Sequence, residues 1–125
     1  MNNKNILIAA AVLGALSVAI GAFGAHGLKP LLLEHGRLDT FETAVKYQFY
    51  HTLAIFGLGI LMLKYPDKHF KYSAVCMIAG IVIFSGSLYV LCLTNIAVLG
   101  AITPIGGVMF ILGWIFMALG VRKAL

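Results

Sequence analysis

Four long apolar stretches, almost free of charged side chains, constrain this fold more than any other feature. Each approaches the roughly 20 apolar residues that a membrane-spanning helix needs, and none alternates with the period of a β-strand. The stretches cover about residues 6–25, 44–63, 72–93 and 97–121. The sequence therefore predicts an all-α membrane protein, one domain over residues 1–125, with four transmembrane helices in an antiparallel bundle.

Composition excludes most other classes of protein. Hydrophobic residues make up 62% of the 125 residues and charged residues 10%, against about 45–50% and about 25% in average soluble domains. A soluble chain of this length could not bury so much apolar surface. Soluble enzymes, disordered chains and secreted disulfide scaffolds are excluded. The basic residues form no stripe for nucleic acid, and Cys76 and Cys92 are too far apart on one helix for a disulfide.

The distribution of Lys and Arg predicts the orientation of the four spans. The side that holds the N-terminus, the second connection and the C-terminus carries six cationic residues, namely Lys4, Lys64, Lys68, Lys71, Arg122 and Lys123. The opposite side carries three, namely Lys29, Arg37 and Lys46. Because cytoplasmic segments carry the excess of Lys and Arg, we expect both termini in the cytoplasm of a multi-pass protein in the bacterial plasma membrane. The alternative for the first stretch, a cleaved signal peptide, fits its length less well.

The long outer connection, residues 26–46, contains a candidate short helix. Pro30 stands where a first helical turn accepts proline, and Gly36 stands where a helix ends. Its leucines are then expected to rest on the membrane interface. An ordinary loop is the alternative.

Further signals mark the start of the second long helix and the third connection. Asp39 and Glu42 have the spacing of a capping box, and Glu42 and Lys46 have the spacing of an i,i+4 ion pair. The second long helix is therefore predicted to begin near Thr40. The connection Thr94–Asn95 is so short that the third and fourth helices must form an antiparallel hairpin.

Two rows of small residues recur at helical spacing. The first consists of Ser17, Gly21 and Ala25, and the second of Gly106, Gly113 and Gly120. Small residues allow helix backbones to approach closely in membranes. Each row is either a packing seam within the bundle or an interface between copies of the chain.

Polar residues within the apolar stretches form the candidate functional site. They are His26, Tyr47, Gln48, His51, Ser85, Tyr89 and Thr103. The predicted topology places them in the outer half of the membrane, with His51 about one helical turn, roughly 6 Å, inside the boundary. Ser85 and Tyr89 share a helix face, and Ser87 points elsewhere.

Two interpretations of this polar set stay open. Polar side chains in hydrocarbon need partners, so the set is either a hydrogen-bond network that fixes helix register or a pocket open to the outer face. Pro104 favours the pocket, because a proline removes a backbone donor and leaves a carbonyl free. A metal site at His26 and His51 is not expected, since two histidines are too few ligands.

Catalytic chemistry is not expected. No Asp or Glu lies within the apolar stretches, and no nucleophile–base arrangement can be assembled there. His51 is the one titratable side chain with an ordinary pKa near neutrality within them. The sequence thus predicts no catalytic residue, no cofactor and no metal.

Four motifs resemble a known family. Residues 21–28 read GAFGAHGL, residues 43–51 TAVKYQFYH, residues 84–89 FSGSLY and residues 103–107 TPIGG. Together they resemble the YgdD/YwdK-type family of small bacterial inner-membrane proteins, similar to transmembrane protein 256. The resemblance implies a four-helix membrane protein of this length and assigns no activity to any residue.

The functional expectation is accordingly coarse. The leading interpretation is a non-enzymatic structural or accessory membrane protein that contacts the lipid bilayer, further copies of itself or other membrane proteins. The alternative is a unit that binds or transports a small molecule, an ion or a lipid through the polar pocket. No nucleic acid partner is expected.

Overall fold

The computed structural model describes all of residues 1–125 and contains helices with no β-strand, which confirms the all-α prediction. The elements are α1 (Asn3–Ala25), α2 (Lys29–His35), α3 (Leu38–Lys64), α4 (Lys68–Gly80), the π-helix η1 (Ile81–Ser85), α5 (Gly86–Thr94), the 3₁₀-helix η2 (Ala97–Ala101) and α6 (Thr103–Ala124). Helices α4, η1 and α5 follow one another without a break.

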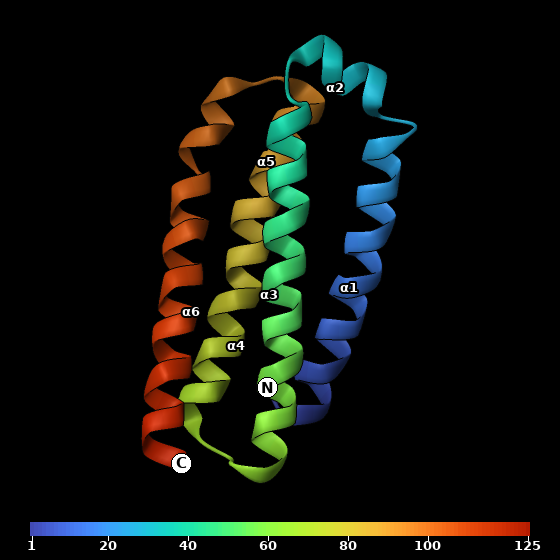
Figure 1. Cartoon of the computed structure of the whole chain (residues 1–125). Helices are drawn as coiled ribbons and strands as arrows, with labels where there is room; N and C mark the ends of the chain where they lie inside the picture. Colours follow the sequence, from blue (N-terminus) through green and yellow to red (C-terminus); the bar gives the residue numbers. More distant parts are fainter.

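The long helical segments run side by side, each antiparallel to the next in sequence, and both termini lie at the same end (Figure 1). Three segments are long and apolar enough to cross a membrane, namely Asn3–Ala25, Lys68–Thr94 and Ala97–Ala124. Helix α3 is 27 residues long but is not among these three. Its polar residues, Gln48 and His51 included, lower the hydropathy of a segment that is otherwise long enough.

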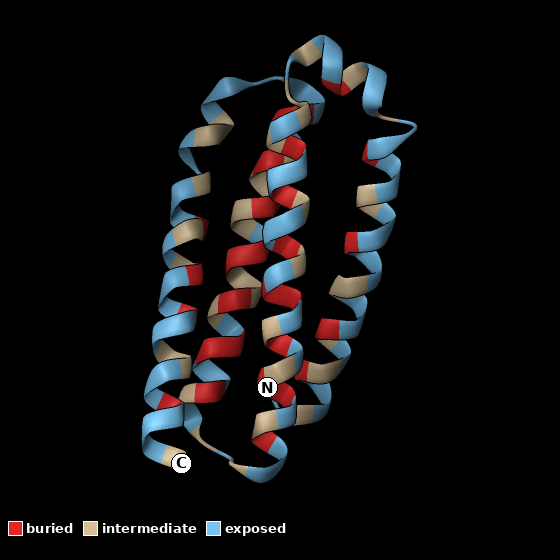
Figure 2. Cartoon of the chain, viewed as in Figure 1, coloured by how far each residue is buried: buried red, intermediate tan, exposed pale blue.

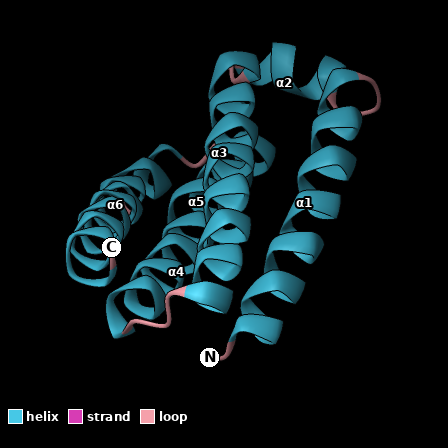
Figure 3. Ribbon diagram, turned by 60° about the horizontal axis from the view of Figure 1, so that its bottom comes forward, coloured by secondary structure: helices cyan, strands magenta, loops and turns pink.

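Helix α3 occupies the centre of the arrangement. It packs against α1 and α2 on one side and against α4, η1 and α5 on the other. Helix α6 packs mainly against α4 and η1, and it has no extensive contact with α1. As Figure 3 shows, α1 and α6 therefore form the two edges of the molecule.

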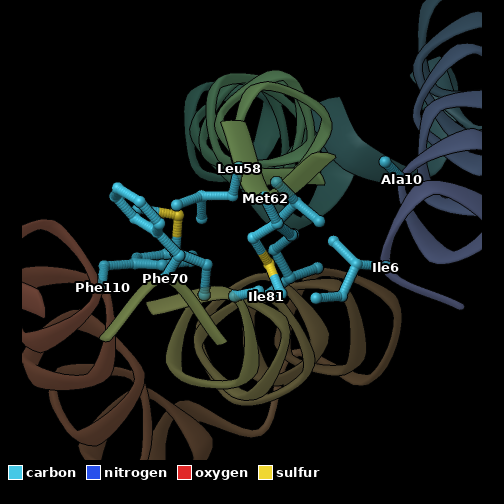
Figure 4. Packing of buried hydrophobic residues seen from close by; sticks show 10 residues of the cluster. Ile6, Ala10, Leu58, Met62, Phe70, Ile81 and Phe110 are labelled. Atoms are coloured by element: carbon cyan, nitrogen blue, oxygen red, sulfur yellow. The ribbon is translucent and has the colours of Figure 1, made fainter. Parts of the chain in front are cut away.

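The hydrophobic core lies where α1, α3, α4, η1 and α6 face one another. Figure 4 shows this cluster, in which Ile6 approaches from α1 and Phe110 from α6. Buried residues follow the inner helix faces in Figure 2, whereas the outward faces are exposed. Those outward faces are apolar as well, with Val12, Val82 and Ile111 each more than half exposed. Apolar surface on both the inside and the outside suits a protein surrounded by lipid.

The glycine row on α6 is a packing seam. Gly106, Gly113 and Gly120 are all buried, and they lie against Phe84, Met77 and Phe70. A Cβ added at any of the three would overlap its neighbour. The neighbours also recur every seven residues, so two heptad rows on antiparallel helices interlock. Close approach of this kind is what small residues allow between membrane helices.

The row predicted on α1 is only partly a seam. Ser17 is buried, and a Cβ on Gly21 would meet Val45 of α3 at 3.3 Å. Ala25 is exposed near the end of the helix and does not take part in this contact. Gly24 lies against Phe41 in its place.

The outer connection contains the predicted short helix as α2. Gly36 ends it in the left-handed conformation, with φ of 66°, which glycine adopts without strain. Its leucines do not all rest on the surface as expected, because Leu32 is fully buried against Phe41 and Cys92. His35 donates from Nδ1 to the Cys92 carbonyl at 2.8 Å, which ties α2 to α5.

Other helix boundaries differ from those predicted. Helix α3 begins at Leu38, so Asp39 lies in its first turn and is not the cap, and Glu42 forms no ion pair with Lys46. The last long helix begins at Thr103 after the separate turn η2. Pro104 explains that delay, because proline fits the first turn of a helix and not its interior.

Candidate functional site

The predicted polar residues do not form one pocket. His26 is exposed at the end of α1, and its side chain makes no hydrogen bond within the protein. The other six residues belong to three separate sets of contacts: a group around Gln48, the contacts of Ser85 and Thr103, and a group around His51.

Gln48 joins three helices. Its Nε2 donates to the carbonyl of Leu13 in α1 at 3.2 Å, and its Oε1 accepts from the hydroxyl of Tyr89 in α5. The Leu13 carbonyl also accepts from Ser17 at 2.7 Å, and the Gln48 carbonyl accepts from Thr52 at 2.7 Å. We call this set the Gln48 face of α3. Every polar group in it has a partner inside the protein.

Ser85 and Thr103 make separate contacts. Ser85, fully buried at the end of η1, donates to the Ala44 carbonyl of α3 at 2.7 Å. Thr103 hydrogen-bonds the hydroxyl of Ser87 at 2.7 Å and so joins the start of α6 to α5. Ser85 and Tyr89 both reach α3, whereas Ser87 faces α6.

His51 is the middle residue of α3. Its Nδ1 lies 2.7 Å from the Tyr47 carbonyl, and the Nε1–H of Trp114 donates to its Nε2 at 3.1 Å. A carbonyl only accepts and an indole N–H only donates, so the imidazole is neutral with its proton on Nδ1. The ring also stacks on Phe110, with centroids 3.6 Å apart. Both nitrogens of His51 are therefore engaged.

A groove opens beside this histidine. It has a volume of about 510 Å³ and is lined by Tyr47, His51, Phe84, Pro104, Gly107, Val108, Phe110, Ile111 and Trp114. Helices α3 and α6 form its walls, and η1 contributes Phe84. Tyr47 stacks on Phe84 at a centroid distance of 4.8 Å. We call Tyr47, His51, Phe110 and Trp114 the His51 face.

The hydroxyl of Tyr47 differs from the other side-chain donors that line the groove. No protein group accepts from it, and the side chain is 40% exposed. By contrast, no buried side-chain nitrogen or oxygen in the molecule lacks a partner. Among the side chains that line the groove, the Tyr47 hydroxyl is thus the one donor without an acceptor in the protein, since the donors of His51 and Trp114 are engaged.

Three participants were missed by sequence reasoning. Trp114 was not recognised as the partner of His51, because a lone tryptophan in an apolar stretch gives no sign of which helix it faces. Ser73, buried in α4, donates to the Gly113 carbonyl at 2.6 Å. The Leu13 carbonyl carries no side-chain signal at all. Phe70, Met77 and Phe84, however, share the spacing of the three glycines, and that match was visible in the sequence.

No group of three or more His, Cys, Asp or Glu side chains is placed to hold a metal ion. The one ion pair joins His69 to Asp67, at the end that holds the termini. Asp67 caps α4 by accepting from the His69 backbone N–H at 2.8 Å. That bond, and then the bond to the His69 ring, hold the pKa of the Asp67 carboxyl below its usual value.

Comparison with known proteins gives a family without an assigned activity. Residues 20–107 match the family described as a protein of unknown function, DUF423. Relatives include the UPF0382 membrane protein SAB0533 of Staphylococcus aureus, 43% identical over 96% of this chain and 97% of its own length. The UPF0382 inner membrane protein YgdD of Escherichia coli is 42% identical over 96% of this chain and 91% of its own.

A third relative, the UPF0382 membrane protein YwdK of Bacillus subtilis, is 42% identical over 98% of this chain and 99% of its own. No solved structure matches the chain. The resemblance to the YgdD/YwdK-type family is thus confirmed over nearly the full length. Together with the three apolar helices, it places the protein in the cell membrane. The chain belongs to the DUF423 family of membrane proteins.

Proposed function

We propose that this is a non-enzymatic structural or accessory protein that crosses the membrane four times, folds as one domain and keeps both termini in the cytoplasm. The internal pairing of every buried polar side chain supports the proposal, because it leaves no reactive group free among them. His51, the residue best suited to proton chemistry, has both ring nitrogens engaged.

The fourth crossing depends on α3. At about 1.5 Å per residue, its 27 residues extend about 40 Å, more than the roughly 30 Å of a bilayer core. Helix α3 also packs between α1 and α4, two segments apolar enough to span. Its Gln48 and His51 are buried within the protein, so they need not meet lipid. An excess of Lys and Arg at the end with the termini supports the cytoplasmic orientation.

Cysteine labelling tests this topology. In a variant without Cys76 and Cys92, Glu34→Cys and Lys68→Cys place single thiols on either side of α3. A maleimide that cannot cross membranes should label Glu34→Cys in intact cells and label Lys68→Cys only after lysis. Labelling of both from the same side would show that α3 does not cross.

The accessory function is expected to act through lateral contacts at the edge helices. Only 17% of the apolar window of α1, and the same share of that of α6, is buried within the molecule. A photo-crosslinking residue at Val12 or Ile115, both exposed, should give a discrete product in native membranes. A product with twice the chain mass indicates self-association, and another mass indicates a second membrane protein. Monomer alone at both positions contradicts lateral contacts.

A second candidate function is the binding of a lipid-soluble molecule in the groove between α3 and α6. The free hydroxyl of Tyr47 favours it, because a donor facing hydrocarbon is unsatisfied without an acceptor. The volume of about 510 Å³ lies within the range of small-molecule sites.

A further inference from the structure

The chemistry of the groove between α3 and α6 restricts what it can hold. The ligand class inferred for this groove rests on the second candidate function. No Asp, Glu, Lys or Arg lines the groove. Its Trp114 wall lies in the middle of α6, within a segment apolar enough to span the membrane. An ionised headgroup at this depth would be unpaired and costly, so the ligand is uncharged.

Only one hydrogen-bond donor is free to meet that ligand. The Trp114 indole N–H is committed to His51, and the His51 ring is committed to Trp114 and to the Tyr47 carbonyl. The Tyr47 hydroxyl remains, with no acceptor in the protein. A ligand that satisfies it carries a neutral oxygen acceptor. A lipid acyl chain has none, and the ester oxygens of a phospholipid adjoin a charged headgroup, for which the groove has no ionic partner.

The walls favour a flat ring. Tyr47 and Trp114 line the groove and are 40% and 47% exposed, so their rings are open to a ligand, whereas His51 and Phe110 stack on each other and are buried. Phe84 stacks on Tyr47 and supports it. Trp114 meets His51 edge-on. Gly107 adds no side chain, and a Cβ there would meet only Phe84, at 3.9 Å. Aromatic surfaces of this kind favour the stacking of a planar ring.

The geometry points to the ring of an isoprenoid quinone, bound between α3 and α6 with one ring carbonyl accepting from the Tyr47 hydroxyl. Its apolar tail lies in the surrounding lipid, past Val108 and Ile111, which are both more than half exposed. The ring combines the three required properties: it is uncharged, planar and carries a neutral acceptor. Binding alone is proposed, without electron transfer.

Trp114 provides a direct readout, since it is the only tryptophan of the chain and lines the groove. The protein is placed in nanodiscs of phosphatidylcholine and titrated with decylubiquinone, a short-tailed quinone that quenches indole fluorescence. Quenching is expected to saturate for the wild type. A tryptophan-containing transmembrane peptide in the same nanodiscs gives the non-saturating control for quinone dissolved in lipid.

Tyr47→Phe tests the hydroxyl, and Tyr50→Phe is its matched control. Tyr50 lies on the same helix, is more exposed and does not line the groove. One hydrogen bond corresponds to about a threefold to tenfold change in affinity. Tyr47→Phe should weaken decylubiquinone binding by that factor, and Tyr50→Phe should leave it unchanged. Quenching that does not saturate, or equal affinity in the two variants, overturns the assignment.

A further arm separates failure of the quinone assignment from failure of the groove. Phosphatidylcholine with brominated acyl chains also quenches tryptophan, and Gly107→Leu fills the groove. One outcome is that bromolipid quenches Trp114, that Gly107→Leu abolishes this quenching, and that quinone quenching does not saturate. An acyl chain then occupies the groove, and the quinone assignment is wrong. If neither quencher responds to Gly107→Leu, the groove binds nothing and the second candidate function fails with it.

Discussion

Tyr47 of α3 and Tyr89 of α5 use their hydroxyl groups in different ways. On the Gln48 face, the Tyr89 hydroxyl donates to Gln48, whose amide in turn donates to the Leu13 carbonyl. On the His51 face, the Tyr47 hydroxyl has no acceptor, although its backbone carbonyl accepts from His51. One face joins three helices through a complete hydrogen-bond chain. The other leaves one donor beside a groove. The two faces of α3 thus differ in whether the tyrosine hydroxyl is used within the protein.

The groove requires close packing of α6 against η1, and the absence of a side chain at Gly106 permits that packing. A Cβ at Gly106 would overlap the backbone of Phe84, which cannot turn aside as a side chain can. We expect Gly106→Ala to lower the free energy of unfolding by about 3 kcal/mol. Gly107→Ala, one residue on, has room and should change it little. Thermal unfolding in detergent, followed by circular dichroism, compares them, and equal melting temperatures would contradict the seam.

The Gln48 face should lose stability when its chain is cut. Gln48→Leu removes the acceptor of the Tyr89 hydroxyl and is expected to cost about 1–3 kcal/mol. Tyr89→Phe should then lower the free energy of unfolding less in the Gln48→Leu background than in the wild type, because in that background the Tyr89 hydroxyl already lacks its acceptor. The free energies of unfolding of the two single variants and the double variant give the coupling energy between Gln48 and Tyr89. Strict additivity would mean that the Gln48–Tyr89 bond does not contribute.

The His51 face should be weaker. Trp114→Phe removes the single bond between α3 and α6 at this level and is expected to cost about 0.6–1.7 kcal/mol, the range measured between membrane helices. In a His51→Phe background, Trp114→Phe should lower the free energy of unfolding less, because the acceptor of the indole N–H is already absent. A cost above that of Gln48→Leu would reverse the ranking of the two faces.

The smallest effect is expected at Asp67, which caps α4 at the end of the molecule that holds the termini. The lowered pKa of Asp67 means that its carboxylate stabilises the start of α4 above the ordinary aspartate pKa of about 3.9. That stabilisation is lost as the pH falls through the lower pKa of the folded state. The melting temperature of the wild type should exceed that of Asp67→Asn at pH 6, and the gap should close in acid. A gap that stays constant down to pH 2 would show that the charge of Asp67 does not contribute, since asparagine caps a helix about as well as aspartate.

The positions of the helices could be predicted from the sequence, because a long apolar stretch has few alternatives to a helix in lipid. The local signal at Gly36 also sufficed for α2. The starts of α3 and α6 were predicted less well, because neighbouring residues offered alternative starting points for the helix. Leu38 begins α3 ahead of the expected Thr40, and Pro104 delays α6. The π-helix η1 gave no sequence signal that we recognise, although Gly80 and Gly86 flank it.

The division of the polar residues could not be predicted. Helical spacing places Tyr47, Gln48 and His51 within one arc of α3, but it does not say which neighbour covers each part of that arc. The structure directs Gln48 toward α1 and α5, and His51 toward α6. His26 was grouped with them by depth alone, and it lies apart. Partners such as Trp114 and the Leu13 carbonyl are set by packing between helices and not by any pattern within one helix.

The contrast between the two hydroxyl groups is tested most directly by removing each of them. Tyr89→Phe and Tyr47→Phe are compared in quinone-free phosphatidylcholine nanodiscs by thermal unfolding. Loss of a hydrogen bond should lower the stability of Tyr89→Phe by about 1 kcal/mol, while Tyr47→Phe, which loses no partner within the protein, should match the wild type. Equal destabilisation by the two changes would show that the Tyr47 hydroxyl has a partner inside the protein and would contradict the account.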